Sequence, residues 1–253
     1  MRAKGEDAVA TRQTDYAKLT ADIEGSPMEM LVFEPEGAGP FPGVVVAQHF
    51  PVAHAGLEGD PFTLDIGARL VAAGHAAIIP YLFHWWAPDA DRDAKRAEWR
   101  DDRTVKDLDA AYGALNGRDK VDGGRMAIIG HCWGGRMAWL GACHEPAYKA
   151  CAVLYGGRIK LPMGAGSVAP ITLVDQLNCP MIGIFGNDDR NPSPADVDDL
   201  DAALGGAGVE HEFHRYDGAG HGFQDFVNAE RYRAAASEDA WKKVLAFLDR
   251  HLK

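Results

Sequence analysis

The chain has 253 residues, of which 47% are hydrophobic and 25% are charged, and its formal net charge at pH 7 is −11. This length and apolar content predict one large α/β domain over residues 1–253, with a sizeable core and a charged surface. The acidic balance, with no cluster of Lys and Arg, argues against a nucleic-acid-binding protein, which usually carries a basic stripe.

The sequence gives no sign of export or membrane insertion. Residues 1–30 mix basic, acidic and scattered apolar residues, and they lack the uninterrupted apolar core of a signal peptide. No later apolar run approaches the length of a membrane span. We therefore expect a cytoplasmic protein that does not bind membranes.

The first half of the sequence alternates predicted strands and helices. Two strands are expected within residues 16–33, around the turn signal Gly25-Ser26-Pro27. Continuous apolar runs predict strands buried on both faces at residues 42–47 and 76–80. Helical periodicity predicts helices at residues 63–73 and 92–116.

The second half continues the alternation. Further buried strands are predicted at residues 126–130, 150–155 and 181–185, and an alternating strand at 210–216. The remaining helices are predicted at residues 134–143, 196–204 and 241–252. Short apolar strands that alternate with helices indicate crossover connections. The predicted fold class is α/β, with a mostly parallel central sheet and helices on both faces.

The segment at residues 130–135, G-H-C-W-G-G, joins a buried strand directly to a predicted helix. This is the context of a nucleophile elbow, a tight turn that lifts a reactive side chain above the sheet, with Cys132 in the nucleophile position. Side chains two residues before or after it would clash in this turn, which gives a steric reason for Gly130 and Gly134. The helix N-terminus favours negative charge on the sulfur. The alternative interpretation is a tight turn around a buried cysteine.

An acidic residue and a histidine follow, in the order that a nucleophile elbow requires. Asp188 and Asp189 come after one predicted strand, and we favour Asp189 while keeping Asp188 as the alternative. His221 follows the last predicted strand, between two glycines. Each residue alone has an ordinary structural explanation, such as a turn or a helix cap for the aspartates. Together they predict Cys132 as nucleophile, His221 as its base and Asp189 as the acid that orients the base.

Four stretches resemble the dienelactone hydrolase family of α/β-hydrolases: V-V-V-A-Q-H-F at 44–50, G-H-C-W-G-G at 130–135, G-N-D-D-R-N-P-S-P at 186–194 and G-A-G-H-G-F at 218–223. The resemblance implies an α/β-hydrolase fold and hydrolysis of an ester or lactone through an acyl-enzyme, with catalytic residues Cys132, Asp189 and His221. It also implies that the backbone N–H groups of Phe50 and Trp133 form the oxyanion hole. The expected partner is a small-molecule ester or lactone, and we expect no cofactor.

The chain departs from the family pattern at two places. His49 stands where well-studied members have a glutamate that contacts the resting thiol, and Gln224 and Asp225 stand where they have an arginine for the substrate carboxylate. Trp85 and Trp86 lie in a loop where another arginine would be expected. We therefore expect a bulkier, neutral or aromatic ester, with His49, Trp85 and Trp86 as candidate contacts to the thiol or the substrate. Their alternative role is ordinary packing or loop hydrogen bonding.

The spacing of the histidines and cysteines argues against a metal-dependent enzyme. The histidines near strand ends form no H-E-x-x-H motif and no two cysteines form C-x-x-C, so we expect no metal. A redox role lacks a resolving cysteine beside Cys132. The alternative function is a non-catalytic or weakly active small-molecule binding protein that retains the hydrolase fold, an alternative motivated by the replaced glutamate. We expect a monomer or a small homo-oligomer.

Overall fold

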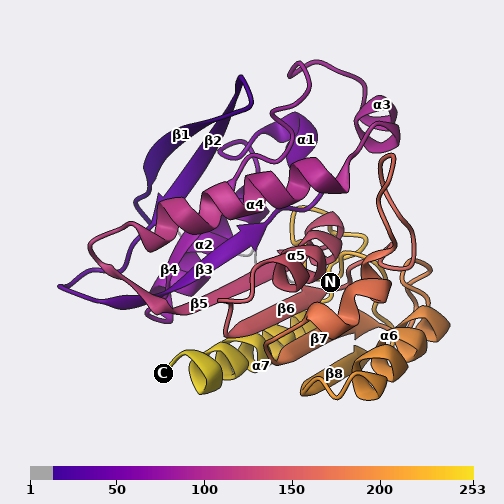
Figure 1. Ribbon diagram of the computed structural model, residues 1–253. Coiled ribbons are helices and arrows are strands. Elements are labelled where there is room, and N and C mark those ends of the chain that lie inside the picture. The colour runs from indigo at the N-terminus through magenta and orange to yellow at the C-terminus, as the bar shows by residue number, and fades with distance from the viewer. Residues whose placement is uncertain (1–13) are drawn as a thin grey trace, which may run out of the picture.

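The computed structural model of the protein describes residues 14–253, and eight strands form one sheet in the order β1-β2-β4-β3-β5-β6-β7-β8 (Figure 1). β2 pairs antiparallel with β1 and β4, and every other adjacent pair is parallel. The predicted mostly parallel sheet is confirmed. The strands are β1 (Ala17–Ile23), β2 (Ser26–Phe33), β3 (Phe41–Ala47), β4 (Ala76–Pro80), β5 (Val121–His131), β6 (Ala150–Leu154), β7 (Met181–Gly186) and β8 (His211–Tyr216).

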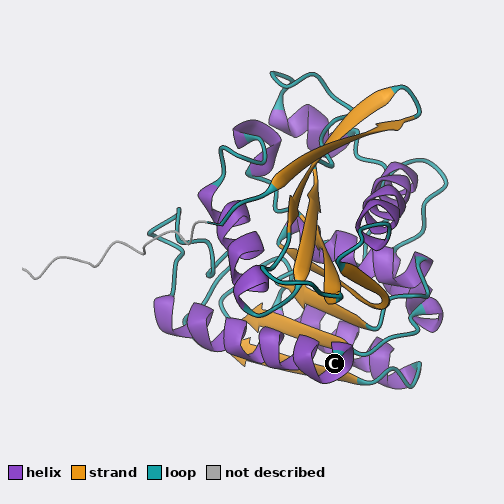
Figure 2. Cartoon of the chain, turned by 90° about the vertical axis from the view of Figure 1, so that its left-hand side faces the viewer, coloured by secondary structure: helices purple, strands orange, loops and turns teal. Residues whose placement is uncertain are grey.

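Helices cover both faces of the sheet, as predicted. Figures 1 and 2 together show α4 and α5 on one face and α2 and α7 on the other. None of the helices between residues 14 and 253 is long and apolar enough to cross a membrane. The helices are α1 (Val52–Ala55), α2 (Pro61–Ala72), α3 (Arg92–Ala97), α4 (Asp101–Asn116), α5 (Trp133–His144), the 3₁₀ helix η1 (Pro170–Gln176), α6 (Pro194–Gly206) and α7 (Ala234–Leu252).

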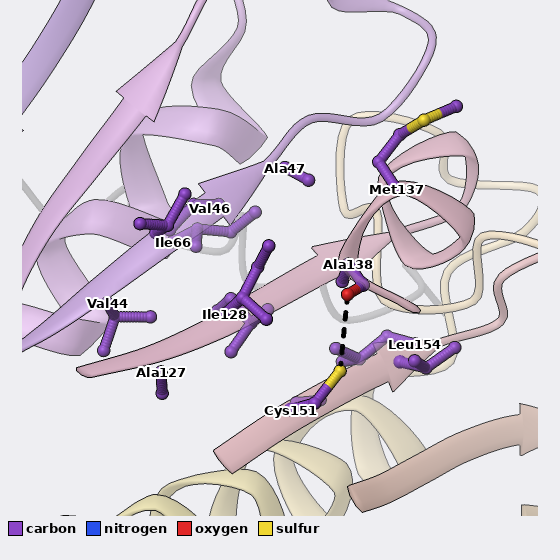
Figure 3. Packing of buried hydrophobic residues seen from close by; sticks show 14 of the residues in the cluster. Val44, Val46, Ala47, Ile66, Ala127, Ile128, Met137, Ala138, Cys151 and Leu154 are labelled. Carbon is purple, nitrogen blue, oxygen red and sulfur yellow. Dashed lines mark hydrogen bonds between the residues drawn. The ribbon is translucent and has the colours of Figure 1, made fainter. Parts of the chain in front are cut away.

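The centre of the core lies where β3, β5 and β6 run side by side beneath α5 (Figure 3). These strands are buried on both faces, which is why their sequences are continuous apolar runs and do not alternate. Val44 and Ile128 are fully buried on neighbouring strands, and Met137 of α5 is fully buried above them. The Cys151 thiol donates to the carbonyl of Ala138 at 3.6 Å, and this fully buried cysteine is a core residue.

The predicted helix at residues 92–116 is wrong at one point, because the structure breaks it into α3 and α4. Between them, the Trp99 ring is buried and packs edge-on against Phe83 and Trp133, with ring centroids 5.3 Å apart in both pairs. Arg100 is extended, at φ −132° and ψ 124°, and precedes α4 as its N-cap. A straight helix could not deliver Trp99 to this aromatic cluster, so tertiary packing overrides the local periodicity.

Smaller differences have simple causes. α7 starts at Ala234, seven residues before the apolar period that marked it, since its first two turns bury only the small side chains of Ser237 and Ala240. α1 and η1 were not predicted because they are too short to show a period. The expectation that residues 1–30 hold no targeting segment concerns, in part, residues 1–13, which lie outside the described residues.

Candidate active site

Cys132 lies in the turn between β5 and α5, at the carboxyl edge of the sheet. Its backbone has φ 56° and ψ −120°, a strained conformation for a residue with a side chain. A Cβ atom on Gly130 would lie 1.9 Å from the carbonyl oxygen of Gly134, and one on Gly134 would lie 2.1 Å from that of Ala47. Both glycines are therefore required by close backbone contacts, and the turn has the geometry expected of a nucleophile elbow.

His221 lies within hydrogen-bond distance of both other residues selected from the sequence, Cys132 and Asp189. His221 Nε2 is 2.9 Å from the sulfur of Cys132, and His221 Nδ1 is 2.8 Å from Asp189 Oδ2. Asp189 is only 5% exposed, and its other carboxylate oxygen accepts the backbone N–H of Asn191 at 2.8 Å. Asp188 is exposed, and among the bonds within residues 14–253 its backbone N–H donates to the carbonyl of Ala219 at 3.0 Å, while its carboxylate has no partner there. The geometry therefore favours Asp189 over Asp188.

The electrostatics of this group favour a thiolate beside an imidazolium. Burial raises the pKa of the Cys132 thiol, but the hydrogen bond with His221, the positive charges of His221 and His49 and the N–H of Trp133 together bring it below the ordinary value. Burial lowers the pKa of His221, but the hydrogen bonds to Asp189 and the thiol outweigh it and raise that pKa to about 10. Both shifts favour the state in which His221 carries the proton.

The two residues expected to supply the oxyanion donors, Phe50 and Trp133, pack against each other. Trp133 is the first residue of α5, and its backbone N–H interacts with the sulfur of Cys132. The backbone N–H of Phe50 makes no hydrogen bond within residues 14–253. The rings of Phe50 and Trp133 are 5.2 Å apart, which brings the end of β3 and the start of α5 together. Within residues 14–253 the N–H of Phe50 thus has no protein acceptor, whereas that of Trp133 faces the sulfur.

His49, Trp85 and Trp86, the candidate contacts to the thiol or the substrate, each bond to a different acidic residue. His49 is buried and its Nε2 donates to Asp60 at 2.6 Å. The indole N–H of Trp85 donates to Asp107 at 2.9 Å. The indole N–H of Trp86 donates to Glu98 at 2.9 Å, and its ring stacks on Trp99. Each side chain thus has the ordinary packing and hydrogen-bonding role that was its alternative interpretation, and His49 alone is electrostatically coupled to the thiol.

Sequence reasoning missed the two arginines of α3 that lie over the ring of Phe50. The guanidinium carbons of Arg96 and Arg92 lie 4.5 and 5.3 Å from the centre of the Phe50 ring, and that of Arg158 lies 5.9 Å from the Trp133 ring. The i, i+4 spacing of Arg92 and Arg96 places both on one face of α3. Nothing in the sequence indicates which residue that face contacts.

The described residues offer no obvious metal site. Within residues 14–253, no group of three or more His, Cys, Asp or Glu side chains is arranged to hold a metal ion. The groups that the geometry brings together at this edge of the sheet are a thiol, an imidazole and a carboxylate.

The model of the dienelactone hydrolase family matches residues 28–252. The chain belongs to this family. It is therefore a hydrolase of esters or lactones with the α/β-hydrolase fold, and the expectations of fold, family and general function are confirmed. The finding does not favour the alternative of a non-catalytic binding protein.

Individual relatives align with this chain over most of their length. A Methylorubrum extorquens protein named "Putative carboxymethylenebutenolidase" is 30% identical over 252 residues, which cover 94% of this chain and 83% of the relative. The carboxymethylenebutenolidase of Rhodococcus opacus is 29% identical over 203 residues, covering 76% of this chain and 77% of the relative. A crystal structure titled as a "Putative Dienelactone Hydrolase" from Klebsiella pneumoniae aligns with a TM-score of 0.82 and 26% identity, covering 93% of this chain and 98% of that one.

Proposed function

We propose that this hydrolase uses Cys132 as its nucleophile, His221 as its general acid and base, and Asp189 to orient His221. The observation that carries the proposal is the pair of contacts at 2.9 Å from His221 to the sulfur and 2.8 Å from His221 to Asp189. A nucleophile in a strained turn at a helix N-terminus, with a base that is itself oriented by a carboxylate, is the arrangement required for covalent catalysis.

Acylation begins from the ion pair. The Cys132 thiolate attacks the ester carbonyl carbon, a C–S bond forms, and the π electrons move to the carbonyl oxygen. The N–H groups of Phe50 and Trp133 stabilise this oxyanion, a contribution worth about 3 kcal/mol per donor. The tetrahedral intermediate then expels the alkoxide, which takes the proton from His221 Nε2. With a lactone, this alcohol stays attached to the acyl group.

Deacylation uses the same groups in reverse. Neutral His221 removes a proton from water, and the resulting hydroxide attacks the thioester carbon while the same two N–H groups hold the oxyanion. Collapse breaks the C–S bond and releases the carboxylic acid and the Cys132 thiolate. His221 keeps the proton it took from water, and Asp189 stabilises the imidazolium throughout. The resting ion pair is thereby restored.

The decisive experiment replaces the thiol. We expect Cys132→Ala to lower kcat for a chromogenic short-chain ester and for a simple lactone by about 10³-fold or more, the scale of nucleophile removal in a related mechanism. Cys179→Ala is the matched control, because Cys179 is buried and burial raises its pKa to about 12. We expect it to retain activity within about twofold.

A second measurement detects the acyl-enzyme itself. Acid quenching during turnover, followed by peptide mass spectrometry, should find the acyl group on the peptide that contains Cys132. Full activity of Cys132→Ala, or an acyl group on another residue, would refute the proposed nucleophile and leave the family assignment intact.

A further inference from the structure

A second histidine–aspartate pair lies beside the proposed nucleophile. His49 and Asp60 are each 4% exposed, and His49 Nε2 donates to Asp60 Oδ2 at 2.6 Å. Asp60 also accepts the backbone N–H of Thr63 at 3.0 Å and its hydroxyl at 2.5 Å. Asp60 is the N-cap of α2, so its carboxylate is fixed by the helix that it starts. The carboxylate in turn fixes the imidazole of His49.

The topology of the sheet places this pair next to Cys132. β3 and β5 are adjacent and parallel, and Ala47 is in register with Gly130. His49 and Cys132 therefore leave neighbouring strands two residues beyond paired positions. A Cβ atom on Gly134 would lie 2.7 Å from the carbonyl oxygen of Gln48, which shows how tightly the end of β3 lies against the elbow.

Four titratable groups face His49 from the elements around it: Asp60 at the start of α2, Cys132 in the elbow, Asp225 after β8, and His131 at the end of β5. Burial lowers the pKa of His49, but the hydrogen bond to Asp60 and the negative charges of Asp60, Cys132 and Asp225 outweigh it, so the net direction is upward. Burial raises the pKa of Asp60, but its bonds with His49 and Thr63 bring it below the ordinary value. Both shifts favour the form of the pair in which His49 is an imidazolium and Asp60 a carboxylate.

We propose that His49, held and charged by Asp60, is a positioning residue that stabilises the thiolate of Cys132 and takes no part in proton transfer. The proposal rests on the proposed function, because it assigns His49 a role at the nucleophile assigned there. His221 exchanges protons with the substrate and water in every turnover. His49 is held in an ion pair and keeps its charge, so the thiolate has a second cationic partner besides His221 whenever it forms.

A stabilised thiolate would help both acylation and deacylation. A stabilised thiolate is populated at lower pH, where an ordinary thiol, with a pKa of about 8.5, is almost entirely protonated. It is also the group expelled when the thioester is hydrolysed, and thiolates of lower pKa leave faster. His49 should therefore lower the pH at which Cys132 reacts and assist its release during deacylation.

The test measures the alkylation of Cys132 by iodoacetamide as a function of pH, with the modified peptide followed by mass spectrometry. We expect His49→Gln to move the midpoint of the profile upward by about one pH unit, so that the rate near pH 6 falls about tenfold while the high-pH rate is unchanged. Asp60→Asn should move it in the same direction, because asparagine preserves the helix cap but removes the charge that holds His49 protonated.

His54→Gln is the matched control, because His54 is exposed on α1 and lies five residues away. Its alkylation profile should coincide with that of the unmodified protein. If the His49→Gln and Asp60→Asn profiles also coincide with that of the unmodified protein, the inference is wrong. That result differs from failure of the proposed function, which would appear as hydrolysis that survives in Cys132→Ala.

Discussion

At the scale of single residues, two adjacent aspartates illustrate how position decides role. Asp189 is buried with both carboxylate oxygens engaged, by His221 and by the N–H of Asn191, whereas the carboxylate of Asp188 is exposed. We expect Asp189→Asn to lower kcat/KM by about 10²–10⁴-fold, because the amide favours the wrong imidazole tautomer and withdraws the charge that supports the imidazolium. Steady-state hydrolysis of a chromogenic ester is the measurement.

Asp188→Asn is the control for that prediction and should stay within about twofold of the unmodified enzyme. If the two variants lose activity equally, or if Asp188→Asn is the more damaged, the assignment of Asp189 is wrong. Circular dichroism and thermal unfolding of both variants separate a catalytic loss from a loss of fold.

The residues of the candidate site differ in how well the sequence alone could select them. Cys132, Asp189 and His221 each follow a strand, and the order of nucleophile, acid and histidine restricts the choice. Asp60 could not be selected, because an aspartate before Pro61 is fully explained as a helix cap. Its contact with His49 depends on how α2 packs against the end of β3, which no local pattern encodes.

At the scale of elements, the buried strands could be predicted and the break between α3 and α4 could not. Continuous apolar runs are specific to strands covered on both faces. The break depends on Trp99, whose burial against Phe83 and Trp133 involves residues far away in the sequence. The N-terminus of α4 is then fixed by Asp101, which forms a two-pronged ion pair with the fully buried Arg136 of α5.

This ion pair should be a strong determinant of stability. Arg136 also donates to the carbonyls of Arg158, at 3.1 Å, and Leu161, at 2.7 Å, so it joins α4, α5 and the segment after β6. We expect Arg136→Met to lower the free energy of unfolding by about 3–5 kcal/mol, because it leaves the carboxylate of Asp101 buried without its partner. Urea denaturation followed by circular dichroism measures the change.

A neighbouring exposed pair provides the control for the Arg136 prediction. Arg100 and Asp102 form an ion pair in which both side chains are 46% exposed. Arg100→Met should change the free energy of unfolding by no more than about 0.5 kcal/mol, since solvent screens the pair. A cost below about 1 kcal/mol for Arg136→Met would contradict the role given to the buried pair.

At the scale of the whole molecule, the parallel strand order brings the loops after β3, β5, β7 and β8 to one edge of the sheet. The same packing buries His131, the last residue of β5. Both ring nitrogens of His131 lack a hydrogen-bond partner within residues 14–253. Its ring packs among Phe62, Tyr155 and Trp241, with centroids 5.2, 5.9 and 5.4 Å away. Burial, together with the positive charges of His49 and Arg69, holds the pKa of His131 well below its ordinary value.

The sign of the resulting pH dependence follows from proton binding. In the unfolded chain His131 has an ordinary pKa of about 6.5, whereas in the folded protein it stays neutral to much lower pH. Below about pH 6.5 the unfolded state therefore binds one more proton than the folded state at this position. Stability is lost as the pH falls, by about 1.4 kcal/mol per pH unit, and nothing is lost above about pH 7.

We expect His131→Phe to remove this contribution, because an apolar ring suits the aromatic site and binds no proton. The free energy of unfolding, measured by urea denaturation between pH 7 and pH 5, should fall less steeply in the variant, by about 1.4 kcal/mol per pH unit over the acid part of the range. His144→Gln, at an exposed position at the end of α5, should keep the slope of the unmodified protein. Equal slopes for His131→Phe and the unmodified protein would mean that His131 is protonated in the fold, and that its burial does not limit stability in acid.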